Sequence, residues 1–393
     1  MATRTSTTRT TRAECCPSAG ADTRAPAHAD FSFAELVAAY LDCRRHKRNT
    51  ASALEFEARL EHNLIELDED LRAGTYTPGP SICFVVTSPK PREVWAAAFR
   101  DRVVHHLVYN RIAARFHARF IAASCACIPG RGTLYAGRTL ESMVRSATQN
   151  WSRPCMYLKA DLANFFVSID KTILGQLLAA EIHEPWWRAL TLQILHYDPR
   201  PHADVRGDPR RLALIPPHKS LFNQPADRGL PIGNLSSQFF ANVYLNELDQ
   251  FAKHCIGARH YIRYVDDFVV LHPDAAWLNR ALAEIAAFLP AHLRVALNPA
   301  KTIIQPVDRG IDFVGHVIKP WRRTTRPRTF RSALHRLASV PAGELHASAN
   351  STFGLLRQAS HSHHDRAMLA RLLRRRGFAV DRNFTKTYRR TDA

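Results

Sequence analysis

Residues 261–272 read Tyr-Ile-Arg-Tyr-Val-Asp-Asp-Phe-Val-Val-Leu-His, two apolar runs joined by a pair of acidic residues. Runs of β-branched and aromatic residues separated by a short polar step are typical of a β-hairpin. The carboxylates of Asp266 and Asp267 then lie at the hairpin tip, where burying charge is costly unless the charge is paired or binds a metal. For an Asp-Asp pair taken alone, an ordinary polar turn is the alternative.

A third carboxylate, Asp161, ends a similar apolar run at residues 156–161, Met-Tyr-Leu-Lys-Ala-Asp. The pattern predicts a strand whose last residue is this aspartate. An Asp at the end of one strand and an Asp pair at a nearby hairpin tip can hold two metal ions for phosphoryl or nucleotidyl transfer. Because neighbouring side chains on a strand point in opposite directions, Asp266 and Asp267 should contribute unequally, and we expect Asp266 to be the stronger ligand.

The composition indicates a folded, strongly basic protein. Apolar residues make up 46% of the 393 residues, and 54 Lys and Arg against 35 Asp and Glu give a net charge of +19. This length has room for roughly two or three subdomains. A positive charge of this size favours a polyanionic partner, because neutralising phosphates releases counterions. A basic protein without such a partner is the alternative.

The cysteines and the hydropathy argue against several other classes. The eight cysteines contain no Cys-x-x-Cys pair, so we expect no zinc finger, and His361-Ser362-His363-His364 is interpreted as a solvated loop. No apolar stretch reaches the ~18 residues of a membrane span, and nothing resembles a secretory signal. We expect no membrane partner and a cytoplasmic protein with reduced thiols.

Strands and helices alternate along the chain, which favours an α+β sheet backed by helices. Residues 198–228, rich in Pro, Arg, Asp and Gly, predict an inserted loop. Helical periodicity covers residues 31–71 and 94–120, segments that begin near residues 135 and 170, the segment 235–251 with Asn234 or Ser236 as its cap, and residues 276–288. Strands are predicted at residues 82–86, 156–161, 261–272 as a hairpin, 293–297 and 311–318.

Two motifs resemble those of reverse transcriptases. Asp161 followed by Phe165-Phe166 resembles their first palm motif, and residues 264–267 resemble their Tyr-x-Asp-Asp motif. The resemblance covers most of residues 31–320. It implies a right-hand polymerase of fingers, palm and thumb, with an antiparallel palm sheet. The predicted divisions are residues 1–29 as a disordered basic tail, 30–155 as fingers, 156–310 as a palm with an inserted segment at 181–228, and 311–393 as a primer grip and a short basic helical thumb.

The same resemblance implies a two-metal mechanism. Two Mg²⁺ ions, for which Mn²⁺ can substitute, would be held by Asp161, Asp266, Asp267 and the carbonyl of Leu162. A pair of ions in such a site activates the primer 3′-hydroxyl and stabilises the leaving pyrophosphate.

The incoming nucleotide should meet several further residues. Phe166 corresponds to an aromatic gate that would collide with a ribose 2′-hydroxyl and so admit dNTPs, with a core phenylalanine as the alternative. Lys301 corresponds to a lysine that approaches the leaving phosphates and could act as a general acid. The segments 90–92 and 100–102 resemble finger elements that hold the triphosphate, although such basic residues alone are commonly solvated surface charges. The resemblance also implies nucleotide contacts by Arg92, Arg131, Phe165, Ile232, Gly233 and Gln238, and a primer grip at Phe313 and Gly315.

Residues 232–238, Ile-Gly-Asn-Leu-Ser-Ser-Gln, indicate a subfamily. Group II intron and retron enzymes usually have Gln-Gly-x-x-x-Ser-Pro here, whereas Ile-Gly-x-x-x-Ser-Gln resembles the reverse transcriptases of diversity-generating retroelements. These bacterial or phage enzymes copy a template-repeat RNA into cDNA with frequent errors at adenines, and the cDNA replaces part of a target gene. The resemblance implies as partners the template RNA, the RNA–DNA hybrid, dNTPs and a small basic pentameric accessory protein of helical bundles.

Two other functions compete with this one. Reverse transcriptases of antiphage defence systems have related motifs. A catalytically dead nucleic-acid-binding module is the alternative outside the enzymes, but it would be expected to lack one of the three acids, and all are present. The retron Val-Thr-Gly thumb signature is absent, and we interpret the basic, helical tail beyond Lys319 as a short thumb that grips the duplex backbone.

Overall fold

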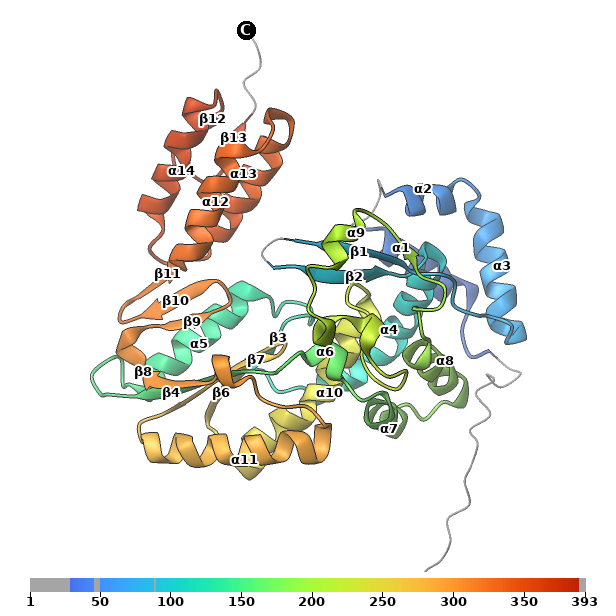
Figure 1. The fold of residues 1–393 in the computed structure, drawn as a ribbon, viewed down its shortest axis with the longest axis horizontal. Helices are drawn as coiled ribbons and strands as arrows, with labels where there is room; N and C mark the ends of the chain where they lie inside the picture. The colour runs from blue at the N-terminus through green and yellow to red at the C-terminus, as the bar shows by residue number, and fades with distance from the viewer. Residues whose placement is uncertain (1–28, 46–49, 88–89, 389–393) are drawn as a thin grey trace, which may run out of the picture.

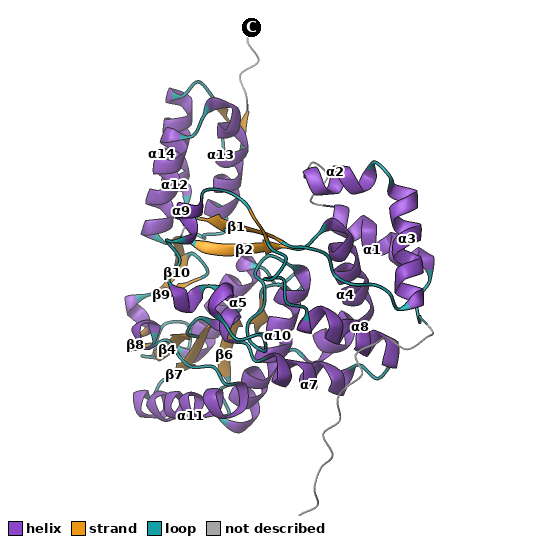
Figure 2. Cartoon of the chain, turned by 45° about the vertical axis from the view of Figure 1, so that its right-hand side comes forward, coloured by secondary structure: helices purple, strands orange, loops and turns teal. Residues whose placement is uncertain are grey.

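The computed structural model describes residues 29–45, 50–87 and 90–388. The predicted basic tail at residues 1–29 lies, except for its last residue, outside the described part. Figure 1 shows a central sheet with helices on both faces, and α12–α14 rise on the same side of this sheet as β1 and β2. Figure 2 shows the same arrangement after a turn of 45°. The predicted α+β architecture is confirmed.

The central, or palm, sheet has five strands in the order β3-β6-β7-β4-β8. All neighbours are antiparallel except β3 and β6, which run parallel over two residues. The predicted strand at 156–161 and the predicted hairpin at 261–272 are confirmed. The strands are β3 (Ser124–Cys125), β4 (Met156–Asp161), β6 (His260–Tyr264), β7 (Asp267–His272) and β8 (Ile303–Pro306).

Period-two alternation divides the palm strands between two cores. Tyr157, Ile262 and Val269 pack on one face with α5 (Thr133–Ala147). Leu158 and Phe268 pack on the other face with helices α10 (Leu235–Gln250) and α11 (Ala275–Leu293). Helices therefore bury both faces of the sheet, and the three acidic residues lie at or next to the ends of its strands.

The first part of the chain forms helices and a small sheet. In the described parts of the predicted helical region 31–71 the chain forms three helices, and the third ends before Gly74, which has φ 69°. The prediction of a helix from residue 94 was wrong at its start: residues 92–96 pair with β1, and the helix begins only at Phe99. The elements are α1 (Phe33–Arg44), α2 (Ala51–Glu57), α3 (Leu60–Ala73), β1 (Ile82–Val86), β2 (Arg92–Ala96) and α4 (Phe99–Arg119).

The segment between β4 and α10 contains more helix than its loop-like composition indicates. Trp186 and Trp187 are buried in a twelve-residue helix that begins at a proline. Residues 198–228 are mostly irregular, as predicted, but β5 joins the small sheet beside β1. The elements are α6 (Phe165–Ser168), α7 (Lys171–Glu181), α8 (Pro185–His196), β5 (Asp204–Val205), α9 (Pro209–Leu212) and the 3₁₀ turns Pro217–Lys219 and Leu221–Asn223.

Two strand predictions near the C-terminal end need correction. Residues 293–297 are not a strand, because α11 extends to Leu293 and only Leu297 forms an isolated bridge, to Leu162. Residues 311–318 form two strands rather than one, and a third strand follows where a helical tail was predicted. The elements are β9 (Ile311–Phe313), β10 (His316–Lys319), β11 (Arg322–Thr325), a bundle of α12 (Pro327–Ser339), α13 (Ala342–Leu356) and α14 (His363–Arg375), and the pair β12 (Ala379–Val380) and β13 (Thr387–Tyr388).

Two findings concern the cysteines and the membrane. The cysteines in the described part, six in number, are free thiols. Within the described ranges, the structure contains no helix with the length and hydropathy that crossing a bilayer requires.

Candidate active site

The pairing of β4 with β7 brings the three predicted acids to one end of the palm sheet. Asp161, the last residue of β4, is the register partner of Asp267, the first residue of β7. Asp266 lies in the turn just before it, and its carbonyl oxygen accepts a hydrogen bond from Leu162 N at 3.3 Å. Leu162, whose carbonyl oxygen is predicted as a further metal ligand, therefore adjoins the acids through its backbone N–H.

Two lysines neutralise part of this acidic cluster. Lys301 Nζ lies 2.5 Å from Asp161 Oδ2, and Lys159 Nζ lies 3.2 Å from Asp267 Oδ2. Sequence reasoning had not assigned a role to Lys159, although it stands two residues before Asp161 and so points to the same face of the strand. Within the described residues, Asp266 forms no ion pair, whereas Asp161 and Asp267 each pair with a lysine.

The remaining negative charge is poorly compensated. Burial and the nearby charge of Asp161 raise the pKa of Asp266 to about 6. Burial raises the pKa of Asp267 to about 6 as well, although the Lys159 ammonium acts against the rise. Asp267 Oδ1 is buried and has no hydrogen-bond partner among the described residues.

These oxygens fit a hard divalent cation such as Mg²⁺, which prefers carboxylate and carbonyl ligands. Among the described residues, no three acidic, His or Cys side chains are already grouped as a closed metal site.

The glycine-bearing segment 229–233 docks beside the residues that follow Asp161. Leu230 N donates to the carbonyl oxygen of Phe166 at 2.8 Å. Phe166 is partly exposed, whereas Phe165 is 2% exposed and stacks edge-on against Phe166 with ring centroids 5.4 Å apart. The predicted nucleotide contact of Phe165 needs correction, because its buried ring presents no surface to a ligand.

The same segment also docks on β2. Trp95 N donates to the carbonyl oxygen of Ile232 at 2.7 Å. Gly233 has φ +129°, and a Cβ there would lie 2.8 Å from the carbonyl oxygen of Trp95, so only glycine fits. Gln238 is exposed on the first turn of α10. Asn234, one of the two predicted caps, is the N-cap residue of α10, but its side chain does not cap the helix, since Asn234 Oδ1 accepts from Ala97 N at 3.1 Å.

The predicted basic residues fall into two groups. Arg92 is exposed at the start of β2, and its charge partly offsets the burial that raises the pKa of Asp266. Arg131 instead donates to the carbonyl oxygens of Ile121 and Ser124, at 2.8 and 3.4 Å, and so shapes its own loop.

The segment 100–102 is structural, contrary to the expectation that it holds a triphosphate. Arg100 pairs with Asp70. Arg102 is buried and donates to the carbonyl oxygen of Ala97 at 2.8 Å.

The predicted primer-grip residues lie in the hairpin of β9 and β10. Gly315 has φ +85° in the turn between the strands, and Phe313 is fully buried, edge-on to Tyr264 with ring centroids 6.4 Å apart. Lys159 Nζ also donates to the carbonyl oxygen of Asp312 at 2.6 Å. One lysine therefore links this hairpin to the acidic cluster.

Comparison with known proteins adds the family. The chain is 23% identical over 334 residues to Protein YkfC of Escherichia coli strain K12, covering 76% of this chain and 81% of that protein. A telomerase from Candida albicans, solved with a fragment of telomeric RNA, is 13% identical with a TM-score of 0.46, covering 76% of this chain and 56% of its own. An apo telomerase from Candida tropicalis is 11% identical with a TM-score of 0.43, covering 63% and 55%.

The chain thus spans little more than half the length of these telomerase chains. The model of the family described as reverse transcriptase (RNA-dependent DNA polymerase) matches residues 88–318, more than half of the chain and the whole palm sheet. The chain therefore belongs to the reverse transcriptase family of RNA-directed DNA polymerases.

Proposed function

We propose that this protein is the reverse transcriptase of a diversity-generating retroelement, which copies a template-repeat RNA into cDNA with errors concentrated at adenines. The observation that carries the proposal is the position of Ile232. Its peptide is hydrogen-bonded to β2, and the adjoining Leu230 is hydrogen-bonded to Phe166, the proposed sugar gate. Ile232, an apolar residue, thus belongs to a segment that is hydrogen-bonded both to β2 and to the residues that follow Asp161.

Nucleotidyl transfer would take place at the three acids. Asp161, Asp266, Asp267 and the Leu162 carbonyl would hold two Mg²⁺ ions, which, when bound, supply the charge that activates a primer hydroxyl and stabilises a leaving pyrophosphate. Lys301, freed from Asp161 by the bound cations, would present its ammonium proton to the leaving phosphates. Arg92 would bind the triphosphate from the start of β2, because a guanidinium fits phosphate oxygens bidentately.

Ile232 offers a physical reason for low fidelity. A polar side chain beside the nascent base pair can form hydrogen bonds that a mispair leaves unmade, and an unmade buried hydrogen bond penalises the wrong substrate. Isoleucine can neither donate nor accept, so this penalty is absent.

Primer extension on an RNA template with purified protein, Mg²⁺ and dNTPs tests the proposal, with Asp266→Ala as the control and the products sequenced. Extension that the control lacks, with errors concentrated opposite template adenine, would support it. Faithful or untemplated products would favour an antiphage defence enzyme. No product, even with the candidate accessory pentamer and cognate RNA added, would favour a nucleic-acid-binding module.

The role of Ile232 has its own test. Ile232→Gln should lower the misincorporation frequency opposite adenine, whereas Ile232→Val, which keeps an apolar side chain, should leave it unchanged. Equal adenine misincorporation in both variants would contradict the proposed role of Ile232, and it would leave the proposal of polymerase activity standing.

A further inference from the structure

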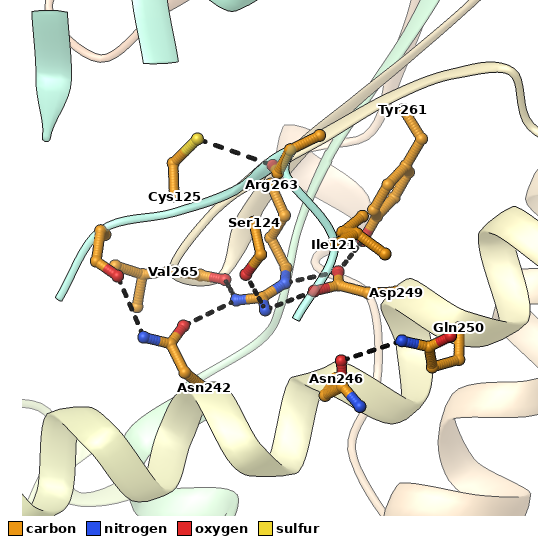
Figure 3. A network of polar contacts seen from close by, with 12 residues as sticks. Ile121, Ser124, Cys125, Asn242, Asn246, Asp249, Gln250, Tyr261, Arg263 and Val265 are labelled. Carbon is orange, nitrogen blue, oxygen red and sulfur yellow. Dashed lines mark hydrogen bonds and ion pairs between the residues drawn. The ribbon is translucent and has the colours of Figure 1, made fainter. Parts of the chain in front are cut away.

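A fully buried ion pair joins the β6–β7 hairpin, which carries Asp266 and Asp267, to α10. Arg263 on β6 and Asp249 on α10 are each 0% exposed. The pair is bidentate: Nε donates to Oδ1 and Nη2 to Oδ2, both at 2.7 Å (Figure 3). Tyr261 Oη also donates to Asp249 Oδ1, at 2.8 Å. Since removing two charges from water can cost more than their attraction returns, a buried pair of this kind requires an explanation other than stability alone.

Every donor of the Arg263 guanidinium has a partner. Besides Asp249, Nη2 donates to Ser124 Oγ at 2.8 Å, and Nη1 donates to Asn242 Oδ1 at 3.2 Å. The second hydrogen of Nη1 goes to the carbonyl oxygen of Val265 at 2.9 Å. A guanidinium has five N–H donors in a rigid fork, whereas a lysine ammonium has three on a flexible stem. One side chain thus connects β3, α10 and the hairpin turn.

The turn that receives this hydrogen bond is strained. Val265 has φ +56°, a conformation that is unfavourable for a β-branched residue and that persists only when its surroundings enforce it. The next peptide is held from the other side, since Leu162 N donates to the carbonyl oxygen of Asp266. The peptides on both sides of the Asp266 Cα are therefore fixed by contacts from neighbouring elements.

We propose that Arg263, locked by Asp249, is a positioning residue that holds the strained Val265 peptide and thereby aims the Asp266 carboxylate at the metal site. The inference rests on the proposed metal-binding role of Asp266. The buried pair then serves to fix the geometry of the site. Of the three guanidinium nitrogens, only Nη1 does not contact Asp249, and Nη1 is the nitrogen that donates to the turn.

The direct test is Mn²⁺ binding to the full chain, followed by electron paramagnetic resonance, with the Mg²⁺ concentration for half-maximal primer extension as a second readout. Arg263→Lys keeps the charge but loses the fork. It should weaken Mn²⁺ binding by about 10-fold or more, the loss typical when a group that orients a metal ligand is removed. The matched control is Ser124→Ala, which removes a hydrogen bond from Nη2 but leaves Nη1 on Val265, and should leave Mn²⁺ affinity unchanged.

If Arg263→Lys does not fold, as judged by circular dichroism, Asn242→Ala replaces it, because it removes the second partner of Nη1, together with the hydrogen bond from Asn242 Nδ2 to the carbonyl oxygen of Ala126. It should weaken Mn²⁺ binding by a smaller factor, still beyond that of the serine control. Folded Arg263→Lys with wild-type Mn²⁺ affinity would overturn the inference, as would equal losses in Asn242→Ala and Ser124→Ala, or a wild-type protein without Mn²⁺ binding. A wild-type protein that binds Mn²⁺ through Asp266 but extends no primer would refute only the proposed function.

Discussion

Replacing Asp266 with asparagine should stabilise the metal-free protein while removing its activity. Burial and the charge of Asp161 raise the pKa of Asp266 from 3.8 to about 6. A group whose folded-state pKa is raised contributes stability that is fully present below its unfolded pKa and is lost as the pH rises through its folded pKa. For Asp266 this window runs from 3.8 to about 6, so above it the ionised carboxylate destabilises the fold.

The size of the effect follows from the same difference in pKa. The interval from 3.8 to about 6 corresponds to about 3 kcal/mol at most, since one pKa unit is about 1.4 kcal/mol. Asp266 is partly exposed, and solvent screens part of the repulsion from Asp161, so we expect Asp266→Asn to raise the free energy of unfolding by about 1–2 kcal/mol near pH 7.5. Near pH 4 the gain should vanish, because the folded wild-type group is then already protonated.

Urea unfolding followed by circular dichroism measures this gain, with EDTA present at both pH values. Asp308→Asn, at an exposed position outside the site, should change the free energy of unfolding by less than about 0.5 kcal/mol. Added Mg²⁺ should stabilise the wild-type protein and not the variant, because a ligand that binds only the folded state shifts the equilibrium toward it. An Asp266→Asn protein less stable than the wild type near pH 7.5 in EDTA would refute the reasoning.

Three further predictions concern the gate, the docking glycine and the thumb. Phe166→Ala should raise ribonucleotide incorporation relative to deoxyribonucleotide by about 10-fold or more, measured by competitive single-nucleotide extension, and unchanged selectivity would contradict the gate. Gly233→Ala should lower the free energy of unfolding by about 1–3 kcal/mol, because a Cβ would lie 2.8 Å from a β2 carbonyl oxygen, while Gly354→Ala, with open space, should not. Glu141→Gln should shorten the products made in a single binding event, because it leaves the buried Arg323 of β11 without its carboxylate partner; product lengths equal to the wild type would exclude this role.

The palm could be predicted because its sequence pattern is local and strong. Residues 156–161 and 261–272 carry apolar side chains on both faces, and each face meets its own helices in the structure. Strand β2 was missed because its state depends on remote partners: it pairs with β1, and its Trp95 amide bonds to Ile232, far along the chain. Short segments of this kind take their conformation from tertiary contacts rather than from propensity.

The acids of the candidate site could be predicted from the sequence, whereas the basic residues that pair with them or fix their backbone could not. Lys159 and Arg263 are single basic residues in apolar strands, and a single basic residue is commonly interpreted as a solvated charge. Their position between apolar residues nevertheless indicates that both side chains are largely buried. A cation flanked by residues that must be buried needs an anionic partner, since an unpaired charge in the interior is strongly disfavoured. The partners, Asp267 and Asp249, could not be assigned without the register of the sheet and the path of α10.

The two lysines and the buried arginine have different roles at the same hairpin: the lysines pair with acidic side chains, and the arginine bonds to the backbone of the turn. Lys159 and Lys301 pair directly with the acids and are partly exposed, so the proposed cations would be able to displace both. Arg263 is fully buried, bonds to a backbone carbonyl rather than to a catalytic acid, and is fixed at every donor. Under the proposed mechanism the acids would exchange their charge partners with each nucleotide added, which requires a backbone geometry that does not change with them. Placing the exchangeable cations at the carboxylates and the permanent one behind the turn meets both requirements, and it accounts for a strained valine and a buried ion pair together.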